Sequence, residues 1–215
     1  MEAIDSPGLV GRRDRNMQDK HARIFRAAAE LFDARGFAAV TTQAISDRAD
    51  VAAGTLFRYA ASKDELLLMV YNQRLRAALK QGERVAADLT APVAAVLAMV
   101  LPILKLGHQY PENLAVYQRQ LMFGQPGEKY RVEGLALINE LETCVAEKLL
   151  QFAAARGQAL APAVARLASI SIFAATHLAV SRVSTGAHPG YDAEDDLRGQ
   201  IQQIVDGCSL AVAAS

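Results

Sequence analysis

Residues suited to phosphate and base contact cluster between Thr41 and Lys63, in the segment TTQAISDRADVAAGTLFRYAASK. Threonine, arginine, tyrosine and lysine side chains donate hydrogen bonds to phosphate oxygens, and small residues let a helix approach base edges closely. The segment therefore predicts contact with double-stranded DNA. The candidate contact residues are Thr42, Gln43, Ala53, Gly54, Thr55, Arg58, Tyr59 and Lys63.

Two short helices joined by a tight turn must position these residues. In the first helix, apolar residues recur at helical spacing and predict a buried stripe. This stripe consists of Ala44, Ile45, Ala49 and Val51. Thr42 is the predicted N-cap, because a threonine hydroxyl there accepts a hydrogen bond from a free backbone N–H.

The second helix is predicted to open at Ala52 or Ala53. Leu56 and Phe57 are expected to face the core, and the residues left pointing outward are Gly54, Thr55, Arg58 and Tyr59. Some candidates also have a purely structural interpretation. Thr42 can be a cap alone, Tyr59 can lie at the edge of the core, and Lys63 can be a solvated charge.

The segment and the helices beside it, expected over residues 23–37 and 62–71, carry a resemblance to a known family. The matching positions are Thr41, Thr42, Ile45, Ala49, Val51, Gly54, Thr55, Leu56, Tyr59, Ser62, Lys63 and Leu66. In this register the segment resembles the DNA-binding domain of tetracycline-repressor (TetR-type) regulators. The resemblance implies phosphate contacts by Thr42, Tyr59 and Lys63. It makes Gln43, Ala53, Gly54 and Thr55 the candidate base readers.

Four positions depart from the family pattern. Asp50 stands where the turn usually has glycine, and aspartate tolerates the left-handed backbone region that the turn requires. Ala52 replaces a serine and removes an N-cap, Phe57 replaces a tyrosine and removes a hydroxyl, and Ala60 replaces a phenylalanine. The helix-turn-helix is expected to survive all four.

The composition predicts an all-α protein. Apolar residues make up 52% of 215 residues, with 7 Pro and 14 Gly, and runs of alternating β-branched residues are missing. Longer helices are expected over residues 16–35, 62–87, 91–108, 111–123, 128–156, 162–184 and 193–212, which gives about nine helices in all. We expect an N-terminal three-helix helix-turn-helix domain followed by a larger C-terminal helical domain for ligand binding and dimerisation.

The predicted domain boundaries follow from these elements. Residues 1–15 are expected to form a flexible basic arm that reaches DNA, or alternatively a disordered tail. Residues 16–75 form the DNA-binding domain, with its helix-turn-helix motif at 41–60, and residues 76–215 form the effector-binding and dimerisation domain. Residues 1–80 hold 13 Lys or Arg against 10 Asp or Glu, and the remainder has the opposite imbalance, which fits phosphate contact by one end.

Several function classes lack support in the sequence. No catalytic motif is present, and Cys144 near His108 or His177 could become a nucleophile only if the fold brought them together. Cys144 and Cys208 are too few for a zinc site or a disulfide scaffold. We expect no enzyme activity, no metal, no cofactor and no membrane segment, and a cytoplasmic, nucleoid-associated location in a bacterium. A helical protein-interaction adaptor stays an alternative.

Polar and aromatic residues within the apolar C-terminal helices predict a cavity for a small hydrophobic effector. A buried polar group without a partner costs about 1–3 kcal/mol, so each needs a hydrogen-bond partner in the protein, in water or in a ligand. The candidates are His108, Tyr117, Gln118, Met122, Phe123, Phe173, Thr176 and His177. The alternative is that each is a core residue satisfied within the protein.

Dimerisation is expected because one small helix-turn-helix unit makes too few contacts for specific binding. Two-fold dimers read two half-sites about 34 Å apart. Apolar faces of the last two helices are the predicted interface, with Ile172, Ala175, Ala179, Ile201, Ile204, Val205 and Cys208. The resemblance implies a repressor that binds a palindromic operator as a homodimer and is released by its effector. A transcriptional activator of the same fold is the alternative.

Overall fold

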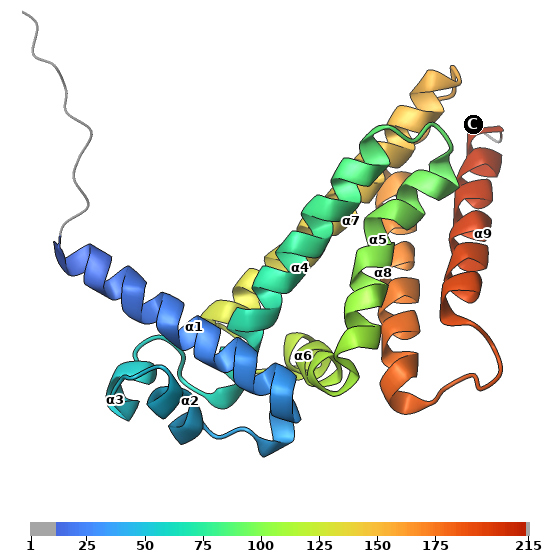
Figure 1. Cartoon of the computed structure of the whole chain (residues 1–215). Helices are drawn as coiled ribbons and strands as arrows, with labels where there is room; N and C mark the ends of the chain where they lie inside the picture. The colour runs from blue at the N-terminus through green and yellow to red at the C-terminus, as the bar shows by residue number, and fades with distance from the viewer. Residues whose placement is uncertain (1–11, 214–215) are drawn as a thin grey trace, which may run out of the picture. The chain divides into compact units, whose positions relative to one another are not determined.

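The computed structural model describes residues 12–213, with side chains from 14 to 209, and within that range the fold is entirely α-helical (Figure 1). Its helices are α1 (Arg12–Ala39), α2 (Thr42–Arg48), α3 (Ala53–Leu56), α4 (Lys63–Ala87), α5 (Pro92–Gln109), α6 (Pro111–Phe123), α7 (Lys129–Ala155), α8 (Pro162–Thr185) and α9 (Ala193–Ala213). Over the described residues, the predicted all-α class and the count of about nine helices are confirmed. The chain divides into two compact units, Met1–Leu67 and Leu68–Ser215.

The first unit contains α1, α2, α3 and the first turn of α4. Its core is built from apolar residues that recur at helical spacing on α1 and from one large side chain on each short helix. Ile24 and Phe32 of α1, Ile45 of α2 and Leu56 of α3 are all fully buried. Burying such side chains contributes about 1.5–3 kcal/mol each, which fixes α2 and α3 against α1.

The turn between α2 and α3 forms as predicted, with one residue in an unusual conformation. Asp50 has φ 51°, in the left-handed region that glycine usually occupies. Its carboxylate accepts a hydrogen bond from Arg23 of α1 at 3.1 Å. The replacement of the usual glycine is thus compatible with the turn.

Two local predictions for this unit are wrong. The N-cap of α2 is Thr41, whose hydroxyl accepts from the backbone N–H of Ala44 at 3.1 Å, so Thr42 is the first helical residue. Phe57 does not face the core, because α3 ends at Leu56 and the chain turns there, leaving Phe57 47% exposed. The predicted arm falls mostly outside the described residues, and Arg12–Arg15 form the first turn of α1.

The second unit is a helical bundle in which α8 contacts α5, α6, α7 and α9 (Figure 1). Its core draws one fully buried aliphatic side chain from each of four helices. These are Leu104, Leu137, Ile172 and Leu197. The segment of α4 after Leu67 is joined to α7 by hydrogen bonds from Asn72 and from Arg76, the latter to Glu133 at 2.7 Å.

By length and composition alone, α5 and α8 could each cross a membrane. Both contact α7 within the second unit. Apolar core helices of other proteins pass the same test, so it is weak evidence for a membrane segment. The helix α5 continues through Pro102.

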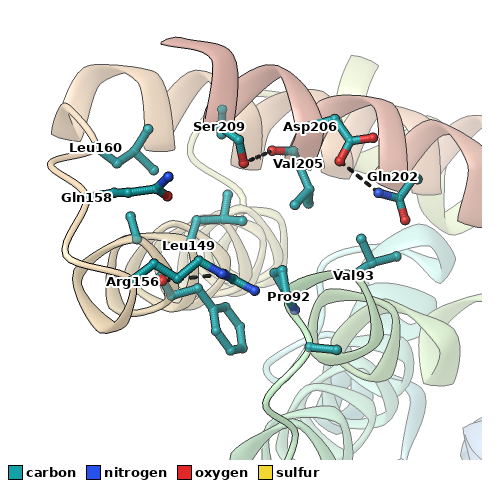
Figure 2. A pocket seen from close by; sticks show the side chains of 14 residues that line it. Pro92, Val93, Leu149, Arg156, Gln158, Leu160, Gln202, Val205, Asp206 and Ser209 are labelled. Atoms are coloured by element: carbon teal, nitrogen blue, oxygen red, sulfur yellow. Dashed lines mark hydrogen bonds between the residues drawn. The ribbon is translucent and has the colours of Figure 1, made fainter. Parts of the chain in front are cut away.

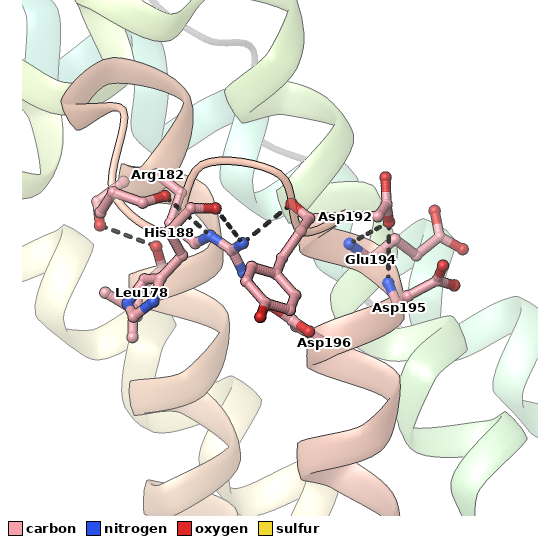
Figure 3. A network of polar contacts seen from close by, with 10 residues as sticks. Leu178, Arg182, His188, Asp192, Glu194, Asp195 and Asp196 are labelled. Carbon is pink, nitrogen blue, oxygen red and sulfur yellow. Dashed lines mark hydrogen bonds and ion pairs between the residues drawn. The ribbon is translucent and has the colours of Figure 1, made fainter.

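A buried arginine fastens the connection between α8 and α9 (Figure 3). The guanidinium of Arg182 pairs with Asp196 at 2.7 Å and donates to the backbone carbonyls of His188 and Tyr191 at 3.2 and 3.0 Å. Only 8% of the Arg182 side chain is exposed, so these bonds replace the water that the charge has lost. The network fixes where α9 begins relative to α8.

Candidate DNA-binding surface and effector cavity

The exposed face of α3 consists of small residues. Ala53 and Gly54 are exposed, and a methyl group built on Gly54 would have no atom within 4 Å. A surface so free of side chains lets the helix backbone approach another molecule closely. Gln43 of α2 is also exposed, and its amide donates to Asp47 of the same helix at 2.7 Å.

Donor groups without a partner in the described part of the chain surround this small face. Arg58 is exposed, and its guanidinium forms no hydrogen bond or ion pair with another described residue. The hydroxyls of Thr42 and Thr55 are likewise unengaged among these residues and half-buried. These are the groups that can donate to a phosphate without breaking an existing bond.

Tyr59 and Lys63 have structural roles in the first unit. The Tyr59 hydroxyl donates to the carbonyl of Met17 at 3.2 Å. The Lys63 ammonium donates to the carbonyls of Phe37 and Val40 at 3.0 Å each, and lies 4.1 Å from the centre of the Phe37 ring. An ammonium has three N–H donors, so one remains for another acceptor.

A narrow cavity lies within the second unit, between α4, α5, α6, α7 and α8. Its walls are mostly leucine, isoleucine and valine side chains, and no charged residue lines it. Its polar lining residues are Tyr117, Gln118, Thr176 and His177. The cavity volume is about 40 Å³. Sites for drug-sized ligands measure roughly 300–1,000 Å³, so a ligand must push side chains apart.

Two buried polar residues connect this cavity to α4. The Tyr117 hydroxyl donates to the side-chain carbonyl of Asn72 at 2.8 Å, and the Asn72 amide donates to the carbonyl of Tyr130 at 2.8 Å. Burial, and secondarily the nearby Glu133 carboxylate, raise the pKa of Tyr117, so its phenol stays protonated. A methyl group on Gly134 would lie 2.8 Å from Asn72 Oδ1, so glycine makes room for this contact.

A second hollow, wider and open, lies between the start of α5, the end of α7 and α9 (Figure 2). Its volume is about 390 Å³, and its lining mixes apolar residues such as Leu149 and Val205 with Arg156 and Asp206. Gln202 donates to Asp206 across one turn of α9 at 2.8 Å. The hollow contains none of the predicted effector residues.

Comparison with known proteins places the first unit in a family. Residues 24–70 match the family described as bacterial regulatory proteins, tetR family. Over 51 residues the chain is 43% identical to the HTH-type transcriptional repressor KstR of Mycobacterium tuberculosis, a match that covers 24% of this chain and 23% of that protein. Residues 24–70 are a DNA-binding domain of the tetR type. The match to KstR is confined to this helix-turn-helix region and spans about a quarter of each protein.

Solved structures of tetR-family regulators share the fold along most of the chain. FadR of Thermus thermophilus, bound to lauroyl-CoA, is 24% identical with a TM-score of 0.69, covering 86% of this chain and 93% of that one. FadR of Bacillus subtilis, bound to stearoyl-CoA, is 19% identical with a TM-score of 0.64, covering 87% and 98%. At these identities the likeness shows the fold.

Against this tetR-family fold, the predicted effector residues divide into two groups. The cavity brings together Tyr117, Gln118, Phe173, Thr176 and His177. His108, Met122 and Phe123 do not line it, because their positions on α5 and α6 turn them toward solvent, and Phe123 is 85% exposed. Residue type alone does not show which side of a helix a residue occupies, so the sequence did not separate these three residues from those that line the cavity.

The predicted dimer residues lie largely inside the chain. Ile172, Ala179, Ile201, Val205 and Cys208 are buried within the second unit, and Ala175 and Ile204 are half-buried. The exposed apolar residues of α8 lie on a different stripe, formed by Leu167, Ile170, Ala174 and Leu178. The sequence reasoning missed this stripe, and it also missed Phe57 as an exposed neighbour of Gly54. The stripe has helical spacing, but residue type alone does not separate a core face from an interface.

Cys144 has none of the features of an activated nucleophile. Its thiol donates to a carboxylate oxygen of Glu83 at 3.3 Å. Burial, with that hydrogen bond, raises the pKa of Cys144 to about 11, so it is a protonated thiol at neutral pH. In the described part of the chain, no group of three His, Cys, Asp or Glu side chains is placed to hold a metal ion.

Proposed function

We propose that this regulator is a repressor that binds a palindromic operator as a homodimer and is released by a small hydrophobic effector. The observation that carries the proposal is the small, unobstructed face of α3, flanked by the unengaged guanidinium of Arg58. This repressor would act in the bacterial cytoplasm, at the nucleoid, without a membrane partner. A transcriptional activator with the same contacts is the second candidate.

On DNA, the proposed roles follow from what each side chain is free to do. Gln43, Ala53, Gly54 and Thr55 face base edges in the major groove, and Phe57 offers its ring to a thymine methyl. Thr42 and Arg58 donate to phosphates. Tyr59 and Lys63 hold α1 against the helix-turn-helix. Lys63 keeps one N–H for a phosphate, whereas Tyr59 donates to a phosphate only by releasing the carbonyl of Met17.

The homodimer would form through the exposed stripe of α8 and the neighbouring face of α9. On α9, Gly199, Gln203 and Gly207 are exposed at four-residue spacing, and methyl groups on both glycines would meet nothing within 4 Å. A hollow of about 450 Å³ between the two helices, lined by Leu178 and Gly199 among others, can accept side chains of a second copy. Two such helix pairs would make a four-helix interface.

The effector would occupy the narrow cavity of the second unit. Its wall is apolar, which suits a hydrophobic chain. Two tetR-family proteins of the same fold are bound to lauroyl-CoA and stearoyl-CoA, molecules that carry such a chain. Acyl-CoA compounds are therefore the first effectors to test.

Release from DNA would be transmitted through α4. A ligand that enters the cavity pushes on Tyr117, whose hydroxyl holds Asn72 of α4. The helix α4 is continuous from Lys63 to Ala87, so it begins in the first unit and carries Asn72 in the second. If the ligand binds better to a state in which α4 is displaced, ligand binding shifts the population toward that state.

The experiment that tests the function is selection of bound fragments from random DNA, followed by gel shift with the selected sequence. We expect a palindromic consensus with half-sites about 10 base pairs apart, and binding that weakens steeply with salt. Failure to enrich any sequence at low salt would end the regulator proposal. Transcription from the selected promoter, measured with and without the regulator, separates repressor from activator.

We expect Tyr117→Phe to uncouple effector binding from DNA release. The ring that lines the cavity is kept, while the hydrogen bond to Asn72 is lost. Effector affinity should stay within about threefold, and the effector's influence on DNA affinity should fall by about fivefold or more, the size of a modest coupling energy. Titrating effector against labelled operator measures both, with Tyr110→Phe as a control, since Tyr110 lies outside the cavity lining. Unchanged coupling in Tyr117→Phe would place the transmission elsewhere.

A further inference from the structure

The polar groups of the effector cavity are almost all occupied, and what remains free restricts the ligand. The Tyr117 hydroxyl is committed to Asn72, and the Thr176 hydroxyl donates to the carbonyl of Ile172 at 2.8 Å. The other two polar residues, Gln118 of α6 and His177 of α8, bond to each other. Because a hydroxyl has only one proton, Tyr117 and Thr176 have no donor left, and a donor for the ligand can come only from that pair.

The bonding within the pair fixes the orientation of the Gln118 amide. Gln118 Nε2 lies 3.1 Å from the backbone carbonyl oxygen of His177, an atom that can only accept. The group facing it must be the amide nitrogen, so the side-chain oxygen of Gln118 points away.

The same nitrogen fixes the histidine tautomer. Gln118 Nε2 is also 3.3 Å from His177 Nδ1. Because the amide nitrogen is a donor, Nδ1 must be the acceptor, and the ring proton then sits on Nε2. Burial lowers the pKa of His177, so the neutral ring is the form present at neutral pH. His177 Nε2–H is the remaining donor of the pair.

The pair is half-buried, as are Ile103, Leu106, Ile138 and Phe173, whereas the remaining lining residues are buried. The pair therefore lies on the more exposed side of the cavity. A chain that fills the cavity would place its first polar atom next to His177 Nε2–H. That donor suits an uncharged carbonyl oxygen. A carboxylate in the same place would lose water without gaining a cation, because no lysine or arginine lines the cavity.

We infer that the effector is an acyl compound whose chain ends in an uncharged carbonyl, an ester or thioester, and that the free fatty acid is not the effector. This inference rests on the proposed function only in placing the effector in this cavity. It assigns His177 as the residue that donates a hydrogen bond to the carbonyl through Nε2–H. Gln118 is assigned as the residue that holds the His177 ring in the tautomer with its proton on Nε2.

The test compares three ligands with the same ten-carbon chain: decanoyl-CoA, the decanoyl thioester of N-acetylcysteamine, and decanoate. Calorimetry and thermal shift on the full chain should give tight binding for both thioesters and at least about 10-fold weaker binding for decanoate. His177→Phe keeps an aromatic ring but removes the donor, and should erase the preference for thioesters. Gln118→Leu frees the imidazole and should reduce it. Arg156→Ala, in the open hollow, should change nothing.

Several results would overturn the inference. Equal or tighter binding of decanoate would mean that charge is accepted, and binding of decanoyl-CoA without the short thioester would mean that the CoA moiety carries the recognition. If the preference for thioesters survives in both His177→Phe and Gln118→Leu, or disappears in Arg156→Ala, the carbonyl is bound at another site. If no acyl ligand binds while the protein still selects an operator, this inference fails and the regulator proposal stands.

Discussion

Gly54→Glu should strongly reduce the affinity for the operator and leave the fold intact. The site is open, since a side chain at Gly54 meets nothing within 4 Å, and its backbone is helical. Replacing glycine in a helix with glutamate favours the helix by up to about 1 kcal/mol. On DNA, however, the carboxylate would enter a groove flanked by phosphates.

The expected loss follows from the number of contacts. A good base contact contributes about 1–3 kcal/mol, and a homodimer loses one in each half-site. The operator affinity should therefore fall by about 30-fold or more, because 1.4 kcal/mol corresponds to a factor of ten. Fluorescence anisotropy with labelled operator measures this loss, and thermal unfolding of the same sample verifies that the protein is folded.

Two control variants separate geometry from charge. Ala94→Glu makes the same change of charge on the exposed start of α5 and should leave operator affinity within about twofold. Gly54→Ala adds only a methyl group and should reduce affinity less than Gly54→Glu. Operator binding by Gly54→Glu equal to that of the unchanged protein would remove α3 from the DNA contact.

The elements of this chain were predictable because their signals are local. Helix ends at Ala87, Phe123 and Thr185 fall within one residue of where the sequence places them, since proline, glycine and polar clusters interrupt the apolar periodicity there. The turn at Asp50 was predictable as well, because few residues tolerate its left-handed conformation.

What a side chain faces was less predictable, because that depends on distant parts of the chain. Lys63 reads as a surface charge in the sequence, yet its ammonium holds two carbonyls at the end of α1. Phe57 reads as a core residue, yet the early end of α3 exposes it. His177 and Gln118 lie 59 positions apart, and only the packing of α8 on α6 brings them together.

Leu178→Glu should split the homodimer while the chain stays folded. Leu178 is 44% exposed in the single chain and lies on the apolar stripe of α8. A glutamate there stays solvated in the monomer, but in the dimer it would be buried without a partner, which is expensive. Sedimentation at micromolar concentration should show a monomer, and the thermal unfolding of that monomer should resemble the unfolding of dissociated unchanged protein.

Operator binding should fall together with the dimer, although no DNA-facing residue has changed. Two linked DNA-binding domains bind a full operator about 10²–10⁴-fold more tightly than one domain binds. A monomeric Leu178→Glu protein should lose this increase in affinity. Gel shift with a full operator and with a single half-site distinguishes this loss from damage to the helix-turn-helix. The half-site affinity should be unchanged.

The contrast with Ile172→Glu decides which face of α8 forms the interface. Ile172 is 1% exposed and lies in the core of the second unit, so a charge there should unfold the unit rather than release a folded monomer. Val132→Glu, at a 54% exposed position on α7, should leave the dimer intact. A Leu178→Glu protein that remains dimeric would place the interface elsewhere. The buried positions on α8 and α9 would still be excluded as its centre, because a side chain that is covered within one copy has little surface left to offer to another.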